Sequence, residues 1–184
     1  MKFFTGDETG LIKEILIPRK SQQKEASPPI TKTWGKIDRN NEVQLIHQAD
    51  ILGEKNQIIV ARKNGVIEVL DPKQDGKVRK NFTEKLMGGD AKNDTRFVGL
   101  FAYDNTLVTC VDKGIVRYHN IAEDDSSSTN KTITITPDLC RLRVHPKENN
   151  IFACGGKERE LSVWDVNACN ETVTVAKNKK ETGL

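Results

Sequence analysis

Hydrophobic and polar residues alternate in short runs along this chain, and four of the runs share one pattern. In each, an apolar segment is followed by two to four polar residues and then by a second segment of alternating β-branched and aliphatic residues. The four stretches cover residues 3–16, 59–71, 108–120 and 152–166. Alternation with a period of two over about four to eight residues is typical of half-buried β-strands. Each stretch therefore predicts a β-hairpin closed by a polar turn.

The four predicted hairpins form an internal repeat. Their turns are closed by Gly10, Gly65, Gly114 and Arg159, which are 55, 49 and 45 residues apart. An apolar residue follows each of them two positions later. Glycine is favoured where a two-residue hairpin turn needs a positive φ, and Asn64-Gly65 is the strongest dipeptide of this kind. Self-similarity at a period near 45 residues, in short strands, indicates the blades of a β-propeller.

Weaker strand patterns flank the hairpins and complete the blades. Predicted first strands precede three hairpins, at residues 43–47, 97–101 and 139–144. Polar fourth strands follow all four, at residues 32–37, 77–82, 131–135 and 171–175. The sequence thus predicts an all-β chain with about four propeller blades in residues 1–176, the first without its opening strand. Propellers close with roughly four to eight blades, so we expect the N-terminal part of a larger ring. Residues 177–184 form a basic segment, expected to be a loop or a truncation point.

Composition and charge exclude several classes of protein. The 184 residues are 36% hydrophobic and 30% charged, with a mean hydropathy of −0.57 and a formal net charge of only +3. A net charge this small does not by itself indicate nucleic-acid binding, so a basic surface must come from local clustering. No apolar run reaches the length of about 18 residues that a membrane span needs. The amino terminus soon turns acidic and lacks the apolar core of a signal peptide.

The four cysteines are Cys110, Cys140, Cys154 and Cys169, and no two form a C-x-x-C pair. A disulfide framework or a zinc site needs tighter grouping, so we expect free thiols in a reducing compartment. Cys110 and Cys154 both fall at the end of a predicted second strand, at positions that we interpret as equivalent to Ala61. A small core residue is expected there rather than a reactive thiol.

The third strand of the fourth copy ends in Trp164-Asp165, after the pair Gly155-Gly156, and this combination resembles a WD repeat. The equivalent pairs in the other copies are His119-Asn120, Leu70-Asp71 and Ile15-Leu16. Four segments in order, GLIKEIL, VARKNGVIEV, LVTCVDKGIVRYHN and FACGGKERELSVWDV, are similar to one WD-repeat family. This is the WD repeat-containing protein seventy-four family, nucleolar factors of 60S ribosomal subunit assembly that have a fungal counterpart. The resemblance spans about residues 9–168.

The resemblance implies a WD-repeat-like propeller of seven blades that acts as a non-catalytic scaffold in the nucleus and nucleolus. The implied partners are assembly factors and large-subunit ribosomal proteins of the pre-60S particle, and pre-rRNA is a further candidate. An AAA-type ATPase is implied as the enzyme that later removes such proteins. Family members usually carry a basic tail after the propeller, which these 184 residues do not contain. The alternative functions are a generic WD-repeat adaptor, such as a ubiquitin ligase substrate receptor, and a propeller that binds a small molecule or substrate in its channel.

The turns between the second and third strands are candidate contact sites, because in a propeller they lie on one face. Three of the four turns contain cations that suit phosphate or an acidic partner. The candidate residues for binding a partner or RNA are Arg62, Lys63, Lys113, Lys157, Arg159 and Trp34. Trp34 lies between Lys32 and Lys36, an arrangement that suits stacking on RNA or anchoring a partner. The competing interpretations are that turns simply need polar residues and that Trp34 covers the edge of a blade.

No segment carries a motif for catalysis. The sequence contains no glycine-rich phosphate loop, no G-x-S-x-G nucleophile elbow and no H-E-x-x-H zinc motif. The carboxylates of Asp124 and Asp125 lie in a serine-rich segment, which does not hold catalytic geometry. His119 stands at the tryptophan position of its copy, where a packing role is expected. We therefore expect no enzyme activity, no cofactor and no metal.

Overall fold

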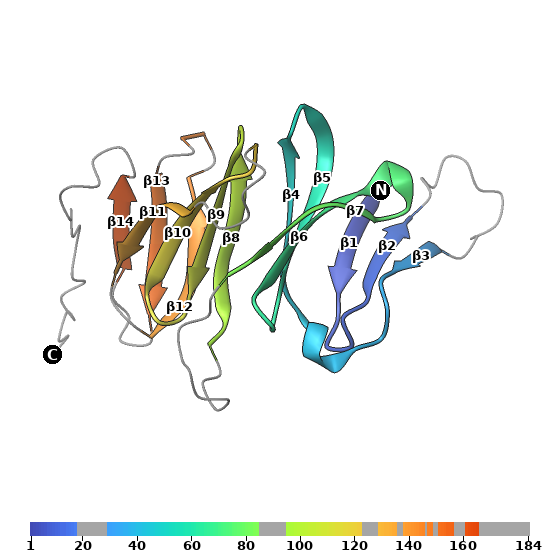
Figure 1. Ribbon diagram of the computed structural model, residues 1–184, viewed down its shortest axis with the longest axis horizontal. Coiled ribbons are helices and arrows are strands. Elements are labelled where there is room, and N and C mark those ends of the chain that lie inside the picture. Colours follow the sequence, from blue (N-terminus) through green and yellow to red (C-terminus); the bar gives the residue numbers. More distant parts are fainter. Residues whose placement is uncertain are drawn as a thin grey trace, which may run out of the picture. The chain divides into compact units, whose positions relative to one another are not determined.

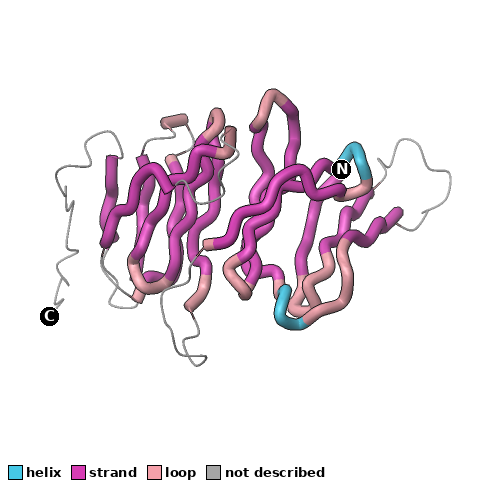
Figure 2. The backbone as a smooth tube through the Cα atoms, in the orientation of Figure 1, coloured by secondary structure: helices cyan, strands magenta, loops and turns pink. Residues whose placement is uncertain are grey.

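A computed structural model describes most of the chain, as almost continuous β-structure. The described residues are 1–17, 29–84, 95–122, 129–135, 138–145, 147–148, 151–156 and 161–165. Figure 2 shows that strands dominate them; the helical elements are two 3-10 turns, η2 (Arg39–Asn41) and η3 (Pro72–Gln74). In this part of the chain no helix has the length and apolar character to cross a membrane. The chain divides into two compact units, Met1–Leu86 and Met87–Leu184.

The first unit contains two antiparallel sheets (Figure 1). One has three strands, β1 (Lys2–Gly6), β2 (Ile12–Leu16) and β3 (Ile30–Trp34). The other has four, β4 (Val43–Ile51), β5 (Glu54–Arg62), β6 (Val66–Asp71) and β7 (Lys77–Thr83). In both sheets each strand pairs with its neighbour in sequence. This is the meander order of a propeller blade.

The second unit repeats the same order of strands (Figure 1). Its four-stranded sheet consists of β8 (Phe97–Tyr103), β9 (Thr106–Val111), β10 (Ile115–Asn120) and β11 (Thr129–Thr134). Its three-stranded sheet consists of β12 (Leu139–Val144), β13 (Ile151–Gly156) and β14 (Leu161–Asp165). The strand predicted at residues 171–175 and the basic segment 177–184 lie outside the described residues.

The predicted architecture of about four blades is confirmed, and the first sheet indeed has three strands. The boundaries differ in places. Strand β4 extends to Ile51, beyond the predicted end at residue 47. The strand predicted at residues 32–37 is β3, which ends at Trp34 because Gly35, with φ of +97°, turns the chain into the left-handed region.

Three hairpin turns share one geometry, which is longer than the predicted two-residue turn. The amide N–H of the closing glycine donates to the carbonyl three residues earlier: Gly65 to Arg62 at 3.0 Å, Gly114 to Val111 at 3.0 Å and Gly10 to Asp7 at 3.2 Å. In each turn only the glycine has a positive φ, between +79° and +84°. This is a type I turn followed by a left-handed glycine, the common three-residue hairpin loop.

Strand pairing aligns the four copies residue by residue. In each copy we compare the residue one before the end of the third strand with its partner on the second strand. These pairs are Ile15 with Phe3, Leu70 with Ile58, His119 with Leu107 and Trp164 with Phe152. On this register Cys154 is equivalent to Thr109, whereas Cys110 and Ala61 are equivalent to Gly155. The predicted equivalence of the two cysteines is therefore wrong. Matching them by residue type shifts the alignment by one position, and a one-residue shift moves a strand side chain to the opposite face.

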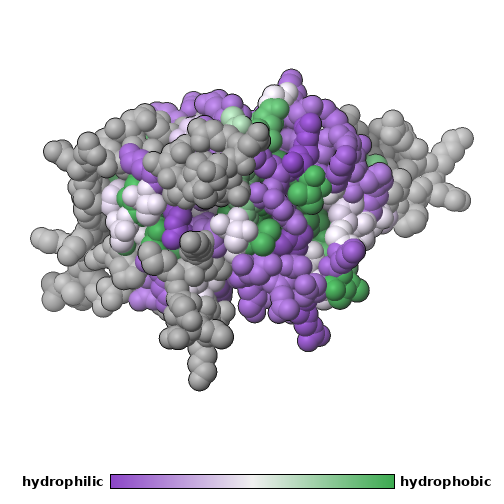
Figure 3. All heavy atoms as spheres, viewed as in Figure 1, coloured by the Kyte–Doolittle hydropathy of each residue, from purple (hydrophilic) through white to green (hydrophobic). Residues whose placement is uncertain are grey.

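Each unit has its own apolar core. In the first unit the core lies between the two sheets and contains Ile12, Trp34, Ile58, Val60 and Leu70. In the second unit Phe152 and Trp164 stack with ring centroids 6.3 Å apart within a larger cluster. His119 is 6% exposed, and its Nε2 lies 3.4 Å from Thr109 Oγ1, so the expected packing role is confirmed. On the face drawn in Figure 3, hydrophilic residues cover much of the described surface and hydrophobic ones form small, separate groups.

Candidate binding surfaces of the first unit

Arg62, a predicted contact residue, is buried at the turn between β5 and β6, with 6% of its surface exposed. Its Nε and Nη2 each lie 2.7 Å from Glu68 Oε2. Its Nη1 donates to the carbonyls of Gly10 at 2.9 Å and Asn41 at 2.8 Å. Gly10 belongs to the β1–β2 turn and Asn41 to η2, so this guanidinium joins the two sheets of the unit. Its donors are used inside the protein.

The other turn cations differ in their surroundings. Lys63 is exposed and places its Nζ 3.3 Å from Glu42 Oε2. Lys113 is exposed at the equivalent turn of the second unit and has no ion-pair partner among the described residues. Lys157 and Arg159 lie outside the described residues. Within the first unit the predicted basic arc therefore consists of two cations that each have a carboxylate partner.

Asp7 adds negative charge at this same end of the sheets. Its Oδ1 accepts hydrogen bonds from the Thr9 hydroxyl at 2.6 Å, the Thr9 amide at 3.0 Å and the Leu11 amide at 3.2 Å. Its Oδ2 lies 3.2 Å from Lys13 Nζ. These contacts lower the pKa of the Asp7 carboxyl to about 2, and the hydrogen bond from the Thr9 hydroxyl has the largest effect. The turn end of the first unit is thus of mixed charge, and no single sign of charge marks it as an anion-binding surface.

Trp34 lies in the core between the two sheets and is 6% exposed. Its ring centroid is 5.5 Å from that of Phe4. The neighbouring cation Lys32 is bound to Asp75, with Nζ 2.8 Å from Oδ1, and this hydrogen bond raises the pKa of the Lys32 ammonium. In this position the indole is covered by protein and is not available to an RNA base.

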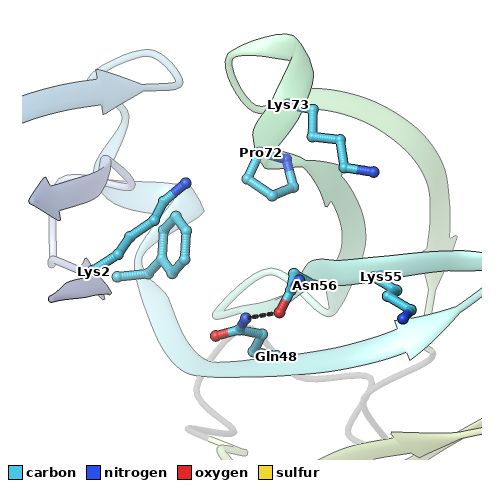
Figure 4. A pocket seen from close by; sticks show the side chains of 7 residues that line it. Lys2, Gln48, Lys55, Asn56, Pro72 and Lys73 are labelled. Atoms are coloured by element: carbon cyan, nitrogen blue, oxygen red, sulfur yellow. Dashed lines mark hydrogen bonds between the residues drawn. The ribbon is translucent and has the colours of Figure 1, made fainter.

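A pocket opens at the opposite end of the same two sheets, and sequence reasoning missed it. Strand β5 connects the two ends, because it starts beside the pocket and finishes at the Arg62 turn. The cavity has a volume of about 360 Å³ and is lined by Lys2, Phe4, Gln48, Lys55, Asn56, Pro72 and Lys73. In Figure 4, Lys2 lies on one side, Pro72 and Lys73 lie opposite, and Gln48 and Asn56 lie along the floor.

The β4–β5 hairpin positions the floor of this pocket. Ile51 pairs with Glu54 across Leu52 and Gly53, whose φ values are +55° and +72°. A two-residue loop with two left-handed residues is a type I′ turn. The register then shifts, and Asn56, with φ of +61°, donates its amide N–H to Asp50 Oδ1 at 2.8 Å. Such bulges re-aim side chains, and here the side-chain oxygen Oδ1 of Asn56 accepts a 2.7 Å hydrogen bond from Gln48 Nε2.

The pocket is lined by cations and contains no carboxylate among its lining residues. Lys2 Nζ is 2.6 Å from Glu14 Oε1 and 5.3 Å from the centre of the Phe4 ring. Lys73 Nζ is 3.3 Å from Glu54 Oε2. Lys55 is exposed and has no ion-pair partner in the described part of the chain. The three lysines are isolated from one another in the sequence, so no motif could have revealed them.

The described residues include no group of three or more His, Cys, Asp and Glu side chains that could hold a metal ion.

Comparisons with known proteins place the chain among WD-repeat relatives, although no family model matches it. Human WD repeat-containing protein 74 is 40% identical over 89 residues, which are 48% of this chain and 23% of that protein. The protein of the same name from Bos taurus is 29% identical over 182 residues, 98% of this chain and 43% of that protein. The predicted resemblance to the WD repeat-containing protein 74 family is confirmed.

The fungal counterpart is found as well. Ribosome biogenesis protein nsa1 of Schizosaccharomyces pombe is 25% identical over 174 residues, 94% of this chain and 41% of that protein. The chain spans less than half the length of the curated relatives that it matches, including WD repeat-containing protein 74.

The fold is shared with a solved WD-repeat propeller. A chain in the crystal structure of the mitotic checkpoint complex superposes with a TM-score of 0.60, covering 91% of this chain and 47% of that chain. The sequence identity is 13%, so this likeness concerns the fold alone. It confirms the WD-repeat β-propeller as the architecture of the described blades.

Proposed function

We propose that the protein is a non-catalytic scaffold in the nuclear and nucleolar assembly of the 60S ribosomal subunit. In this role it binds assembly factors and large-subunit ribosomal proteins in the pre-60S particle, and it contacts pre-rRNA. The observation that carries the proposal is the similarity along 98% of the chain to bovine WD repeat-containing protein 74 and along 94% to the yeast ribosome biogenesis protein nsa1. The WD-repeat fold adds support, because propeller blades offer extended faces and loop surfaces for assembly.

The proposal extends to removal of the scaffold by an AAA-type ATPase. This step rests on the family resemblance and not on a described contact. In purified pre-60S particles, ATP is expected to release the protein, and a non-hydrolysable ATP analogue is expected to leave it bound. Retention in both conditions would contradict this part of the proposal and leave the scaffold role intact.

Affinity purification tests the scaffold role. The whole protein that contains this chain is tagged, expressed at its native level and purified, and the associated proteins and RNA are identified. Large-subunit ribosomal proteins, assembly factors and precursor rRNA are the expected companions, and a tag-only strain is the control. Ubiquitin ligase subunits without pre-60S components would instead establish the alternative, a generic WD-repeat adaptor. A fluorescent fusion that stays outside the nucleus would also contradict the proposal.

A further inference from the structure

We infer that the pocket between β1, the β4–β5 hairpin and η3 binds one nucleotide of a single-stranded RNA. The inference deepens the proposed function and rests on it, because pre-rRNA is the RNA that a pre-60S scaffold meets. It concerns a different end of the blades from the turn residues Arg62 and Lys63. Four features of the pocket carry it: its charge, its apolar walls, its pair of amides and its rigid floor.

The charge of the lining suits phosphate. Lys2, Lys55 and Lys73 supply three ammonium groups to the lining, which contains no carboxylate. Lys2 and Lys73 also pair with Glu14 and Glu54 outside the lining, so Lys55 is the cation of the lining without an ion-pair partner among the described residues. In Figure 4, Lys55 and Lys73 lie on one side and Lys2 on the other. A nucleotide within a strand is flanked by two phosphates, so cations on two sides of a pocket match the backbone that enters and leaves it.

The walls suit a base. Phe4 and Pro72 both contribute apolar surface to the lining. The Phe4 ring packs against Trp34, with ring centroids 5.5 Å apart, and Lys2 Nζ lies over it at 5.3 Å from its centre. Aromatic side chains between cations are the usual platform for unstacked bases in proteins that bind single strands. The volume of about 360 Å³ falls within the range of pockets that take a small ligand. A duplex keeps its bases stacked inside and cannot place one in this cavity.

The two amides of the floor favour a nucleotide over an acidic peptide. Gln48 Nε2 donates to Asn56 Oδ1 at 2.7 Å, and this bond fixes the orientation of both amides. The remaining Gln48 Oε1 and Asn56 Nδ2 have no hydrogen bond to a described residue, so the floor offers one neutral acceptor and one neutral donor to a ligand. Amide groups of this kind pair with the edge of adenine, whereas a carboxylate would use the lysines alone.

The backbone explains why these amides are preorganised. Leu52 and Asn56 both have left-handed φ values in one short hairpin, although neither is glycine. Left-handed conformations of non-glycine residues are uncommon and tend to be held where a function needs them. Here the Asp50 carboxylate holds the Asn56 amide N–H, and the side chain of Asn56 reaches the pocket as a result.

Fluorescence anisotropy with labelled RNA tests the inference on the full chain. The probes are single-stranded dodecamers of adenosine and of uridine, with an RNA duplex and a polyglutamate peptide as competitors. The variant Lys55→Ala/Lys73→Ala removes the cations of one side, and a single-strand phosphate contact contributes about 0.7 to the slope of log affinity against log salt. We expect the slope to become shallower by about 0.7 and the affinity at 0.1 M salt to fall about fivefold. The matched control is Lys36→Ala/Lys147→Ala, which removes two exposed lysines that do not line the pocket.

A second variant separates base recognition from charge. Asn56→Gly removes the amide but keeps a residue that accepts a positive φ. We expect it to abolish a several-fold preference for the adenosine dodecamer without changing the salt slope. Thermal melting of each variant verifies that the chain remains folded.

Three results would overturn the inference. They are unchanged RNA binding by both pocket variants, a larger loss in the Lys36→Ala/Lys147→Ala control, and competition by polyglutamate that equals competition by single-stranded RNA. Sedimentation of cell extracts distinguishes failure of the proposed scaffold function from failure of the inference about the pocket. If the unmodified protein is absent from pre-60S fractions, the proposed function fails; if it is present and the pocket variants bind the dodecamers normally, only the inference about the pocket fails.

Discussion

The indole ring of Trp34 lies directly against the backbone of Gly76, and a Cβ atom at that position would overlap the ring. Trp34 ends β3 in the first sheet, and Gly76 precedes β7 in the second. The two sheets thus come into contact where one of them has no side chain.

Gly76→Ala is therefore expected to destabilise the protein. The substitution places a Cβ at a φ of +75° and also forces the Trp34 ring to move. The combined cost is about 2–4 kcal/mol of unfolding free energy. Gly53→Ala is the matched control, because Gly53 has a similar φ of +72° but open space around its Cα, and its cost is about 1–2 kcal/mol. Urea unfolding measures both, and equal losses would contradict the role of the Trp34 contact.

Arg62→Lys is expected to loosen the link between the two sheets. A lysine ammonium cannot reach Glu68, the Gly10 carbonyl and the Asn41 carbonyl together, since it lacks the planar fork of the guanidinium. Loss of these buried, charge-assisted hydrogen bonds costs about 2–3 kcal/mol. The neighbouring substitution Lys63→Ala removes an exposed cation and should change stability by about 0.5 kcal/mol or less. Denaturant unfolding compares the two, and a smaller effect at Arg62 than at Lys63 would show that the link carries no stability.

Asp7→Asn is expected to lower stability in a pH-dependent way. The folded-state pKa of Asp7 is about 2, below the ordinary value of 3.8, so ionised Asp7 stabilises the folded chain. That stabilisation is complete above about pH 4 and is lost as the pH falls towards 2. The difference in melting temperature between the parent chain and Asp7→Asn should therefore be constant at neutral pH and shrink as the pH falls from about 4 towards 2.

Glu8→Gln provides the control. Glu8 is an exposed residue of the same turn, and this substitution also removes one negative charge. At neutral pH its melting temperature should stay close to that of the parent chain, because surface substitutions usually change stability by about 0.5 kcal/mol or less. A difference at Asp7 that persists unchanged down to pH 2 would mean that the hydrogen bonds to Thr9 and Leu11 do not depend on the ionised carboxyl.

Thiol labelling is expected to separate the cysteines by burial. Cys140 is exposed, whereas Cys110 and Cys154 are buried, and burial raises the pKa of the Cys154 thiol. In a Cys169→Ser background, which removes the cysteine outside the described residues, a disulfide reagent at pH 8 should modify one thiol rapidly. The remaining two should react only after denaturation. Rapid reaction of two or three thiols in the folded chain would show that the β9 or β13 strand is open to solvent.

Local rules predicted the hairpins well. Gly10, Gly65 and Gly114 marked the turns correctly because a left-handed residue is needed at that point whatever surrounds it. The exact loop was longer than predicted, since Asn64-Gly65 suits more than one kind of turn. The position in the other copies to which Cys154 corresponds could not be predicted from the local sequence. It depends on the register in which β13 pairs with β14.

The candidate site was predicted less well, for a physical reason. A polar residue in a turn can point outward or back into the protein, and the sequence does not distinguish Arg62, which turns inward, from Lys63, which does not. Burial of Trp34 depends on Gly76, a residue of another sheet. The pocket combines side chains from β1, the β4–β5 hairpin and η3, and only the packing of two sheets brings them together.

The Arg62 link has a consequence for how these copies could diverge. Apart from Glu68, the guanidinium holds main-chain carbonyls of the neighbouring sheet and its connection, and every residue type supplies such a carbonyl. Side chains around Gly10 and Asn41 could then be exchanged over evolutionary time without loss of the joint, as long as the chain kept its path. Gly10 itself is the exception, because its φ is +83° and a Cβ there would lie 2.9 Å from the Asn41 carbonyl oxygen. Around that one fixed glycine, the two sheets can stay joined while the neighbouring side chains change.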